Sequence, residues 1–201
     1  MRLLLAIAML LQLIGCATAP PVIDLSESVF KAGIENQSER KQIGTLKIIN
    51  KADDGKFVNT ILGSDTIFPI KPAVTTKETV EQDLKRFFDG ALRIDKTADQ
   101  DLTVTISKAD SYWIWGGAAK IPFIGLALVN ADTEFGVNLR ILFEIEIKGK
   151  VTASYLFDEK ITIQDKAATQ EAIIQSYKRL IAEYRKRLFD ELEARFVGRY
   201  F

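Results

Sequence analysis

The sequence predicts an α+β fold in which an antiparallel sheet with a long hairpin is covered on one face by two amphipathic helices. Residues 134–148 carry apolar side chains at the odd positions from 135 to 147 and mostly polar ones at the even positions. Such alternation is typical of an antiparallel strand with one face on a core and the other in water. Two other segments, 77–92 and the stretch from Thr169 onward, place apolar residues at intervals of three and four, which predicts helices.

The N-terminal segment has the layout of a secretory signal. One positive charge, Arg2, precedes an apolar run that is broken only by Gln12 and that ends at residue 15. The run is too short to span a bilayer as a helix, which takes roughly 20 residues. The four residues from Leu13 to Cys16 are similar to the lipobox of bacterial lipoproteins, in which the cysteine becomes the first residue and receives lipid.

Cys16 is the only cysteine of the chain, so it cannot form an internal disulfide. The alternative, a buried N-terminal helix with a core cysteine, is the less favoured interpretation. Ala17 follows the cysteine and is not aspartate, which by resemblance to enterobacterial lipoproteins favours the outer membrane. We therefore expect residues 1–15 to be a signal peptide, 16–40 a lipidated tether, and 41–201 a single domain that faces the periplasm.

The composition removes several classes of function. Lysine plus arginine and aspartate plus glutamate both number 27, so no electrostatic argument favours a nucleic-acid partner. The chain has no histidine and one cysteine, which excludes the usual zinc sites and the Ser-His-Asp and Cys–His nucleophilic arrangements. We predict no catalytic residues, no cofactor and no metal.

The first regular elements expected in the domain are two short apolar stretches, 43–49 and 56–62. The turn-like residues Asp53-Asp54-Gly55 lie between them and suggest a hairpin. A calcium loop is the alternative for this turn, but its ligand spacing lacks the alternate positions and the closing glutamate of an EF-hand. A plain turn is the favoured interpretation.

A helix and a strand are expected next. Thr75 and Glu78 have the spacing of a capping box, and the helix over 77–92 that follows has one apolar and one charged face. Residues 101–112 begin with alternating apolar and hydroxyl side chains, which predicts a half-buried strand.

The long hairpin turns at Lys148-Gly149-Lys150 and returns along a strand that starts at Val151 and extends as far as Ile163. A long helix from about Thr169 closes the chain. Its outer side carries basic residues interspersed with acids, which favours an ordinary solvated face over a phosphate-binding or membrane-binding surface.

At the level of element order the chain resembles the YajG-type family of small envelope lipoproteins. The features that carry the resemblance are the residues ending at Cys16, the strand 43–49, the helix 77–92, the strand 102–106, the hairpin at Gly149 and the closing helix. The resemblance implies an outer-membrane lipoprotein of largely undefined biochemistry, and the family supplies no active-site residues to carry over.

Two glutamates on the long strand, Glu144 and Glu146, lie two residues apart on one face, a spacing of roughly 6.5–7 Å that suits a carboxylate pair. On the polar face of a surface strand they are expected for solubility alone. We therefore assign them no catalytic role.

The stretch from Trp113 to Val129 is the unusual segment of the sequence. It holds both tryptophans and a single charge, Lys120. Either it is a connector folded onto the core, or it is an exposed apolar loop that docks a partner or enters a lipid interface, where tryptophan is favoured; stacking on sugars is a third, weaker alternative. The residues that would carry binding are Trp113, Trp115, Ile121, Phe123 and Leu126.

The function expected from these observations is that of a membrane-anchored, non-enzymatic lipoprotein that binds an envelope protein as an accessory of an assembly or transport complex. The alternative is a lipid-binding or glycan-binding module that uses the Trp113 to Val129 segment. The sequence specifies neither the partner nor the oligomeric state.

Overall fold

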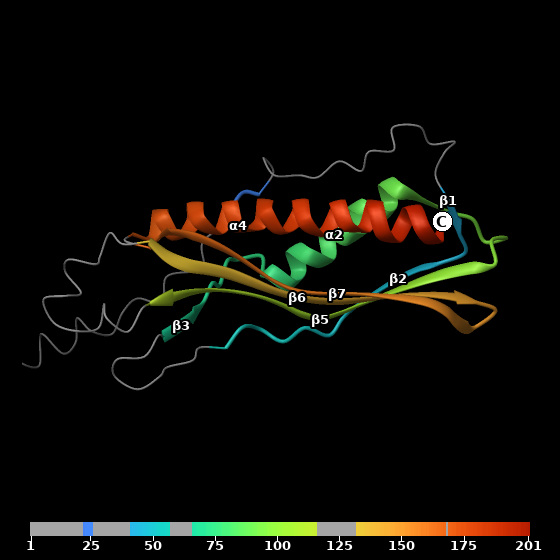
Figure 1. The fold of residues 1–201 in the computed structure, drawn as a ribbon, viewed down its shortest axis with the longest axis horizontal. Coiled ribbons are helices and arrows are strands. Elements are labelled where there is room, and N and C mark those ends of the chain that lie inside the picture. The colour runs from blue at the N-terminus through green and yellow to red at the C-terminus, as the bar shows by residue number, and fades with distance from the viewer. Residues whose placement is uncertain (1–21, 26–40, 57–65, 116–131, 168) are drawn as a thin grey trace, which may run out of the picture.

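The computed structural model describes residues 22–25, 41–56, 66–115, 132–167 and 169–201. Within these ranges a long, twisted sheet is covered on one side by two helices, and the other side of the sheet is open (Figure 1). The strands are β1 (Lys41–Ile43), β2 (Leu46–Asn50), β3 (Thr66–Pro69), β4 (Leu92–Ile94), β5 (Gln100–Trp115), β6 (Asp132–Ile147) and β7 (Lys150–Lys166). The helices are α2 (Thr76–Ala91), α4 (Gln170–Glu191), a π-helical turn η4 (Leu192–Val197) and α5 (Gly198–Tyr200).

The hairpin formed by β6 and β7 confirms the prediction from the alternating pattern. The two strands pair antiparallel from Asp132 opposite Lys166 to Ile147 opposite Lys150. Lys148 and Gly149 both have positive φ, 51° and 73°, as a two-residue hairpin turn requires. Residue 149 is glycine because only glycine adopts this conformation without a steric cost.

The predicted antiparallel sheet is found only in part, because the sheet is mixed. Strand β2 pairs parallel with β5, with Leu46 opposite Leu102, and β1 pairs parallel with β4 in a separate two-stranded sheet. A parallel pair needs a crossover connection, and here helix α2 lies in that connection. Residues 57–62 lie outside the described residues, so the predicted hairpin of 43–49 with 56–62 stays a prediction.

The hydrophobic core lies between the sheet and the two helices. The odd positions of β6 face this core, as predicted, and Phe135, Ile141 and Phe143 are completely buried. Helix α2 packs on β5 and β2, whereas α4 packs on β7 and β6. The rings of Phe87 on α2 and Phe189 on α4 stack at 5.1 Å and join the two helices.

The helix boundaries follow from local capping. Thr75 caps α2, its hydroxyl accepts from the Glu78 amide, and Glu78 accepts from the Thr75 amide in return, so the predicted capping box is present. Thr169 caps α4, where its hydroxyl accepts from the Ala172 amide. Among the described residues, no helix combines the length and the apolar character needed to cross a bilayer.

A buried ion pair links the two helices to the N-terminal part of the chain. The guanidinium of Arg185 donates to both carboxylate oxygens of Asp83, at 2.7 and 2.9 Å, and Tyr184 also donates to Asp83. A further Arg185 nitrogen donates to the carbonyl oxygen of Leu25 at 3.0 Å. Ile23 and Leu25 pack against the core, so the segment Val22–Leu25, named here the N-terminal strap, is held on the helical side of the domain.

Candidate functional site

The candidate site lies on the open face of the sheet and depends on an irregularity in β5. The register with β6 shifts between Ile106 and Lys108, so one residue of β5 has no counterpart. Such a bulge moves the following residues to the opposite face. Before the bulge the even-numbered residues face the helices, as Leu102, Val104 and Ile106 show. Beyond the bulge the odd-numbered Ala109 faces the helices, and Tyr112 lies on the open face.

Tyr112 lies flat against the sheet because its cross-strand neighbour is Gly136. A side-chain carbon added at Gly136 would come within 2.3 Å of the Tyr112 ring, so only glycine leaves room for it. The Tyr112 hydroxyl donates to Glu134 at 2.9 Å, and the Lys160 ammonium lies 2.8 Å from the same carboxylate. The Lys160 nitrogen also lies 5.6 Å from the centre of the ring.

Around Tyr112 the open face forms a hollow of about 580 Å³. The chain after β2 and the edge strand β3 form its walls, and β5, β6 and β7 contribute its floor. We call it the sheet-face hollow. It is lined by Asp53, Asp54, Gly55, Lys56, Ile67, Pro69, Ser107, Lys108, Asp110, Ser111, Tyr112, Ile114, Asn138 and Lys160.

The wall of the hollow is fixed to helix α2. Lys77 on the first turn of α2 pairs with Asp54 at 2.9 Å. The Asn50 side chain donates to Glu81 at 2.9 Å and to the Lys77 carbonyl at 3.1 Å. Gly55 lies against Asp110 and Pro69, where an added carbon would meet side chains at 3.4 Å. The wall is therefore built by specific contacts rather than by a loose turn.

The hollow presents polar groups of both signs beside a small apolar strip. Asp110 accepts from the Asn138 amide at 2.9 Å, and Lys160 and Asp54 are engaged in ion pairs. Lys56 and Lys108 are exposed and take part in none of the ion pairs found among the described residues. Ile67 and Ile114 lie opposite each other on neighbouring strands and supply the apolar part.

Two groups of the hollow, Tyr112 and Lys160, have shifted pKa values. Burial raises the pKa of the Tyr112 phenol, and the hydrogen bond to Glu134 raises the pKa of the Lys160 ammonium. At neutral pH Tyr112 is therefore neutral and Lys160 is charged, whereas a general acid or base works best with a pKa near the operating pH. Among the described residues, no three acidic, histidine or cysteine side chains gather in a group able to hold a metal ion.

We expect the domain to fold without metal, since the residue types that bind soft metals are missing and the core is apolar. A chain that starts near Val22 should give the same melting temperature with and without EDTA. Calcium-free and calcium-supplemented samples serve as the comparison. A large fall in the melting temperature in EDTA would reveal an oxygen-ligand site and contradict this expectation.

Of the residues predicted to bind a partner or lipid, two lie in the described part of the chain, and both belong to β5. Trp113 is half-buried on the helical side, where it stacks on Phe68 at 4.7 Å and packs against the core. Trp115 is 43 % exposed and lies 6.3 Å from the Phe68 ring. Ile121, Phe123, Leu126 and Cys16 lie outside the described residues.

The acidic candidates have structural surroundings. Glu144 and Glu146 lie on the open face, and Glu146 accepts from the Thr103 hydroxyl at 3.3 Å. Asp53 and Asp54 belong to the wall of the sheet-face hollow.

The hollow itself was not predicted, because its residues come from five separate segments. A sequence signal for it did exist, since Gly136 interrupts the polar row of a long strand, and such a glycine often marks the close approach of another group.

No family model matches the chain, and no curated protein sequence matches it. One of the solved structures similar to it is that of a DUF330-family protein from Xanthomonas campestris. The two chains are 12 % identical, the match covers 78 % of this chain and 88 % of that chain, and the TM-score is 0.38. Another is a protein from Helicobacter pylori described as a homolog of neuraminyllactose-binding hemagglutinin, with 12 % identity, coverage of 89 % and 96 %, and a TM-score of 0.39. An uncharacterised protein has 10 % identity, coverage of 76 % and 92 %, and a TM-score of 0.32. Likenesses of this size carry no functional argument, and the resemblance to the YajG-type family stays a prediction.

Proposed function

We propose that this chain is an outer-membrane lipoprotein, anchored through lipid on Cys16 and facing the periplasm, that acts as a non-enzymatic binding component of an envelope assembly or transport complex. The lipobox-like residues ending at Cys16 support the anchor. The observation that supports binding is the sheet-face hollow, whose volume of about 580 Å³ lies in the range of ligand-binding clefts.

The chemistry of the hollow favours a polar occupant that carries both charges, such as an extended segment of a partner protein. Lys56 and Lys108 offer ammonium groups, and Asp53 and Asp110 offer carboxylates. An apolar strip from Ile67 and Ile114 lies beside them. Because the walls are held by ion pairs and hydrogen bonds, a bound segment would meet a preformed site, which lowers the entropic cost of binding.

The same hollow gives little support to an enzyme. The pKa values of Tyr112 and Lys160 are raised, away from the neutral range in which a general acid or base works best. The Tyr112 hydroxyl donates a hydrogen bond to Glu134 and the Lys160 ammonium lies over the ring, so the hydroxyl is engaged. A non-enzymatic role is therefore the simpler proposal.

The alternative proposal, a lipid-binding or glycan-binding module that uses the Trp113 to Val129 segment, is favoured by one observation. Trp115 is 43 % exposed at the end of β5, where the chain continues into that segment. Trp113 lies on the helical side and packs on the core, so under this proposal it would support Trp115 rather than contact the ligand.

A crosslinking experiment in cells tests the binding proposal. A photoreactive amino acid in place of Lys108 should give a discrete crosslinked product, because this exposed residue lies in the hollow. Filling the hollow with Ser107→Trp should remove that product while the melting temperature of the purified protein stays nearly unchanged, since Ser107 is also exposed.

The matched control places the same photoreactive group at Leu156, which is 47 % exposed on β7 and does not line the hollow. It should give no discrete product. The proposal fails if position 156 crosslinks the same molecule as strongly as position 108, or if Ser107→Trp leaves the product from position 108 intact.

A further inference from the structure

We infer that the N-terminal strap fixes which end of the domain faces the bilayer, and that the surface at Trp115 rests on the phospholipid surface to which Cys16 is anchored. The inference rests on the proposed lipid anchor. It concerns a surface and its partner that the anchor alone does not specify, because a long free tether would leave the domain in any orientation.

The N-terminal part of the chain joins the folded body at the strap. Leu25 accepts a hydrogen bond from Arg185, a residue that is itself almost completely buried and paired with Asp83. Ile23 packs on the core and lines a small hollow of about 160 Å³ together with Trp113 and Ile173. The chain is thus held at two points, and its attachment to the body begins at the strap rather than at β1.

The strap has a defined direction along α4. The strap runs from the middle of α4, at Arg185, toward the first turns of α4, where Ile173 lies. Figure 1 shows that this end of α4 shares one end of the molecule with β3 and the end of β5. Val22 therefore lies toward this end of the domain, which we call the tryptophan end because Trp113 and Trp115 lie there.

The chain between Cys16 and the strap is short. Cys16 is 22 − 16 = 6 residues from Val22. A fully extended chain spans at most about 3.6 Å per residue, so the anchor lies within about 22 Å of the strap. The opposite end of the sheet is much farther away, because β6 runs 147 − 135 = 12 residues beyond the Trp113–Phe135 pair, about 40 Å at 3.3 Å per residue.

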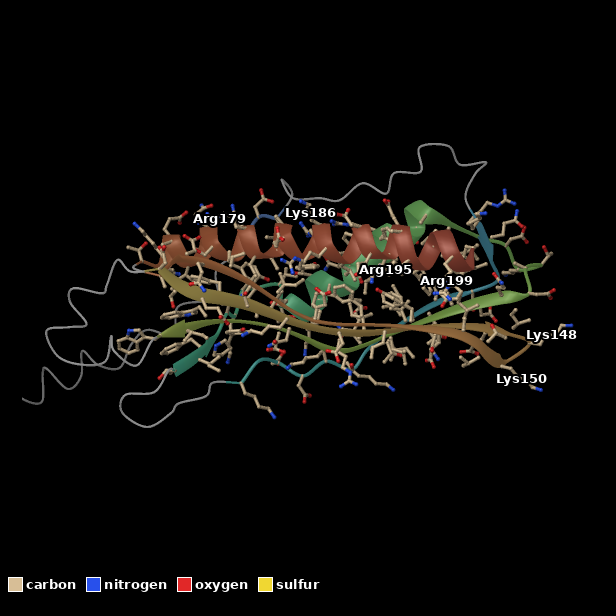
Figure 2. The ribbon with its side chains drawn as sticks, in the orientation of Figure 1. Lys148, Lys150, Arg179, Lys186, Arg195 and Arg199 are labelled. Carbon is tan, nitrogen blue, oxygen red and sulfur yellow. The ribbon has the colours of Figure 1, made fainter. Side chains whose placement is uncertain are left out.

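The tryptophan end carries exposed apolar side chains that can meet the bilayer. Trp115 lies two residues beyond Trp113 on the same face of β5, about 7 Å farther toward this end. It is 43 % exposed, and Val22 is 87 % exposed. Tryptophan is favoured at membrane–water interfaces, so a phospholipid surface is the occupant that fits both the side chain and the short tether. Figure 2 shows Lys148 and Lys150 at the other end of the molecule, which points away from the bilayer in this orientation.

Fluorescence quenching by lipid tests the inference. The chain has two tryptophans, so Trp113→Phe leaves Trp115 as the single reporter. The lipidated protein is reconstituted in vesicles of phosphatidylethanolamine and phosphatidylglycerol with bromine on some acyl chains. We expect the Trp115 emission to fall roughly twofold relative to vesicles without bromine, as for a side chain at the interface.

The matched reporter is Val151→Trp in a protein that also carries Trp113→Phe and Trp115→Phe. Val151 is 55 % exposed and follows the turn at the far end of the sheet. Its emission should be unchanged by bromine. The inference is overturned if position 151 is quenched as strongly as Trp115, or if Trp115 is not quenched.

A pair of insertions tests the role of the strap. About ten glycine and serine residues between Ala19 and Pro20, a flexible segment with a mean end-to-end distance of roughly 17 Å, lengthen the chain upstream of the strap and should abolish the quenching of Trp115. The same insertion between Gln37 and Ser38, downstream of the strap, should leave the quenching intact, because the anchor-to-strap distance does not change. If both insertions have the same effect, the strap does not set the position of the domain.

A second arm separates this inference from the lipoprotein assignment. Because Cys16 is the only cysteine, a chain that starts at Cys16 can be coupled at that residue to a maleimide lipid in the same vesicles. Quenching of Trp115 in the coupled protein supports the geometry even if the cellular protein carries no lipid. Absence of quenching there contradicts the geometry even if the cellular protein is lipidated.

Discussion

Replacing Phe143 with alanine should lower the free energy of unfolding by about 3–5 kcal/mol, the largest effect expected for a single core position of the hairpin. Phe143 is completely buried at the centre of β6. Its ring packs against Phe196 at 5.2 Å, Tyr155 at 6.0 Å and Phe88 at 6.1 Å, so its removal leaves a cavity that touches α2, η4 and the sheet. Chemical denaturation of the mature chain measures the loss.

The control is the neighbouring residue on the same strand. Glu144 lies on the open face, and Glu144→Ala should change the free energy of unfolding by no more than about 0.5 kcal/mol. A large loss for Glu144→Ala and a small one for Phe143→Ala would mean that the two faces of β6 are assigned the wrong way round.

Replacing Arg185 with methionine should cost a similar amount, about 3–5 kcal/mol, because it leaves the Asp83 carboxylate buried without its cation. Both side chains are almost completely shielded from water, and Tyr184 alone cannot neutralise the charge. The substitution also removes the hydrogen bond that holds the N-terminal strap at Leu25. Thermal and chemical denaturation give the size of the effect.

The double variant Asp83→Leu with Arg185→Met distinguishes a lost charge partner from lost packing. With both charges gone and the volume retained, the protein should recover a large part of the stability lost in Arg185→Met. If the double variant is as unstable as the sum of the two single variants, the ion pair does not carry the coupling assigned to it here.

The elements that the sequence predicted well are those specified by their own residues. The alternation over 134–148 describes a strand whose two faces meet different environments, and the structure has that strand. Thr75 and Glu78 cap α2 through contacts three residues apart, so the start of the helix needs no tertiary information. Gly149 marks the hairpin turn because its conformation excludes most other residues.

The features that escaped prediction depend on pairings between distant segments. Nothing in the residues of β2 distinguishes a parallel from an antiparallel neighbour, since the strand has only five residues, of which Lys47 is exposed and the other four are half-buried. The bulge after Ile106 moves Tyr112 to the open face. In the sequence of β5 the bulge shows only as a change of the inward-facing residues from even to odd positions. The sheet-face hollow depends on both features, because β2 positions its wall and Tyr112 forms its floor.

The Trp113 to Val129 segment shows a related difficulty. An apolar run is equally compatible with a strand end and with an exposed loop, because hydrophobicity alone does not reveal what covers a residue. The structure extends β5 through Trp115 and places Trp113 against the core, so the strand ends 115 − 112 = 3 residues later than predicted.

The intact mass of the protein purified from envelope membranes tests the lipid anchor on Cys16. We expect a chain that begins at Cys16, heavier than its sequence by a diacylglyceryl group with or without a further acyl chain, and a Cys16→Ser protein that remains an uncleaved precursor without lipid. A native protein that still carries residues 1–15 and no lipid, or a Cys16→Ser protein that is processed and lipid-labelled, would contradict it.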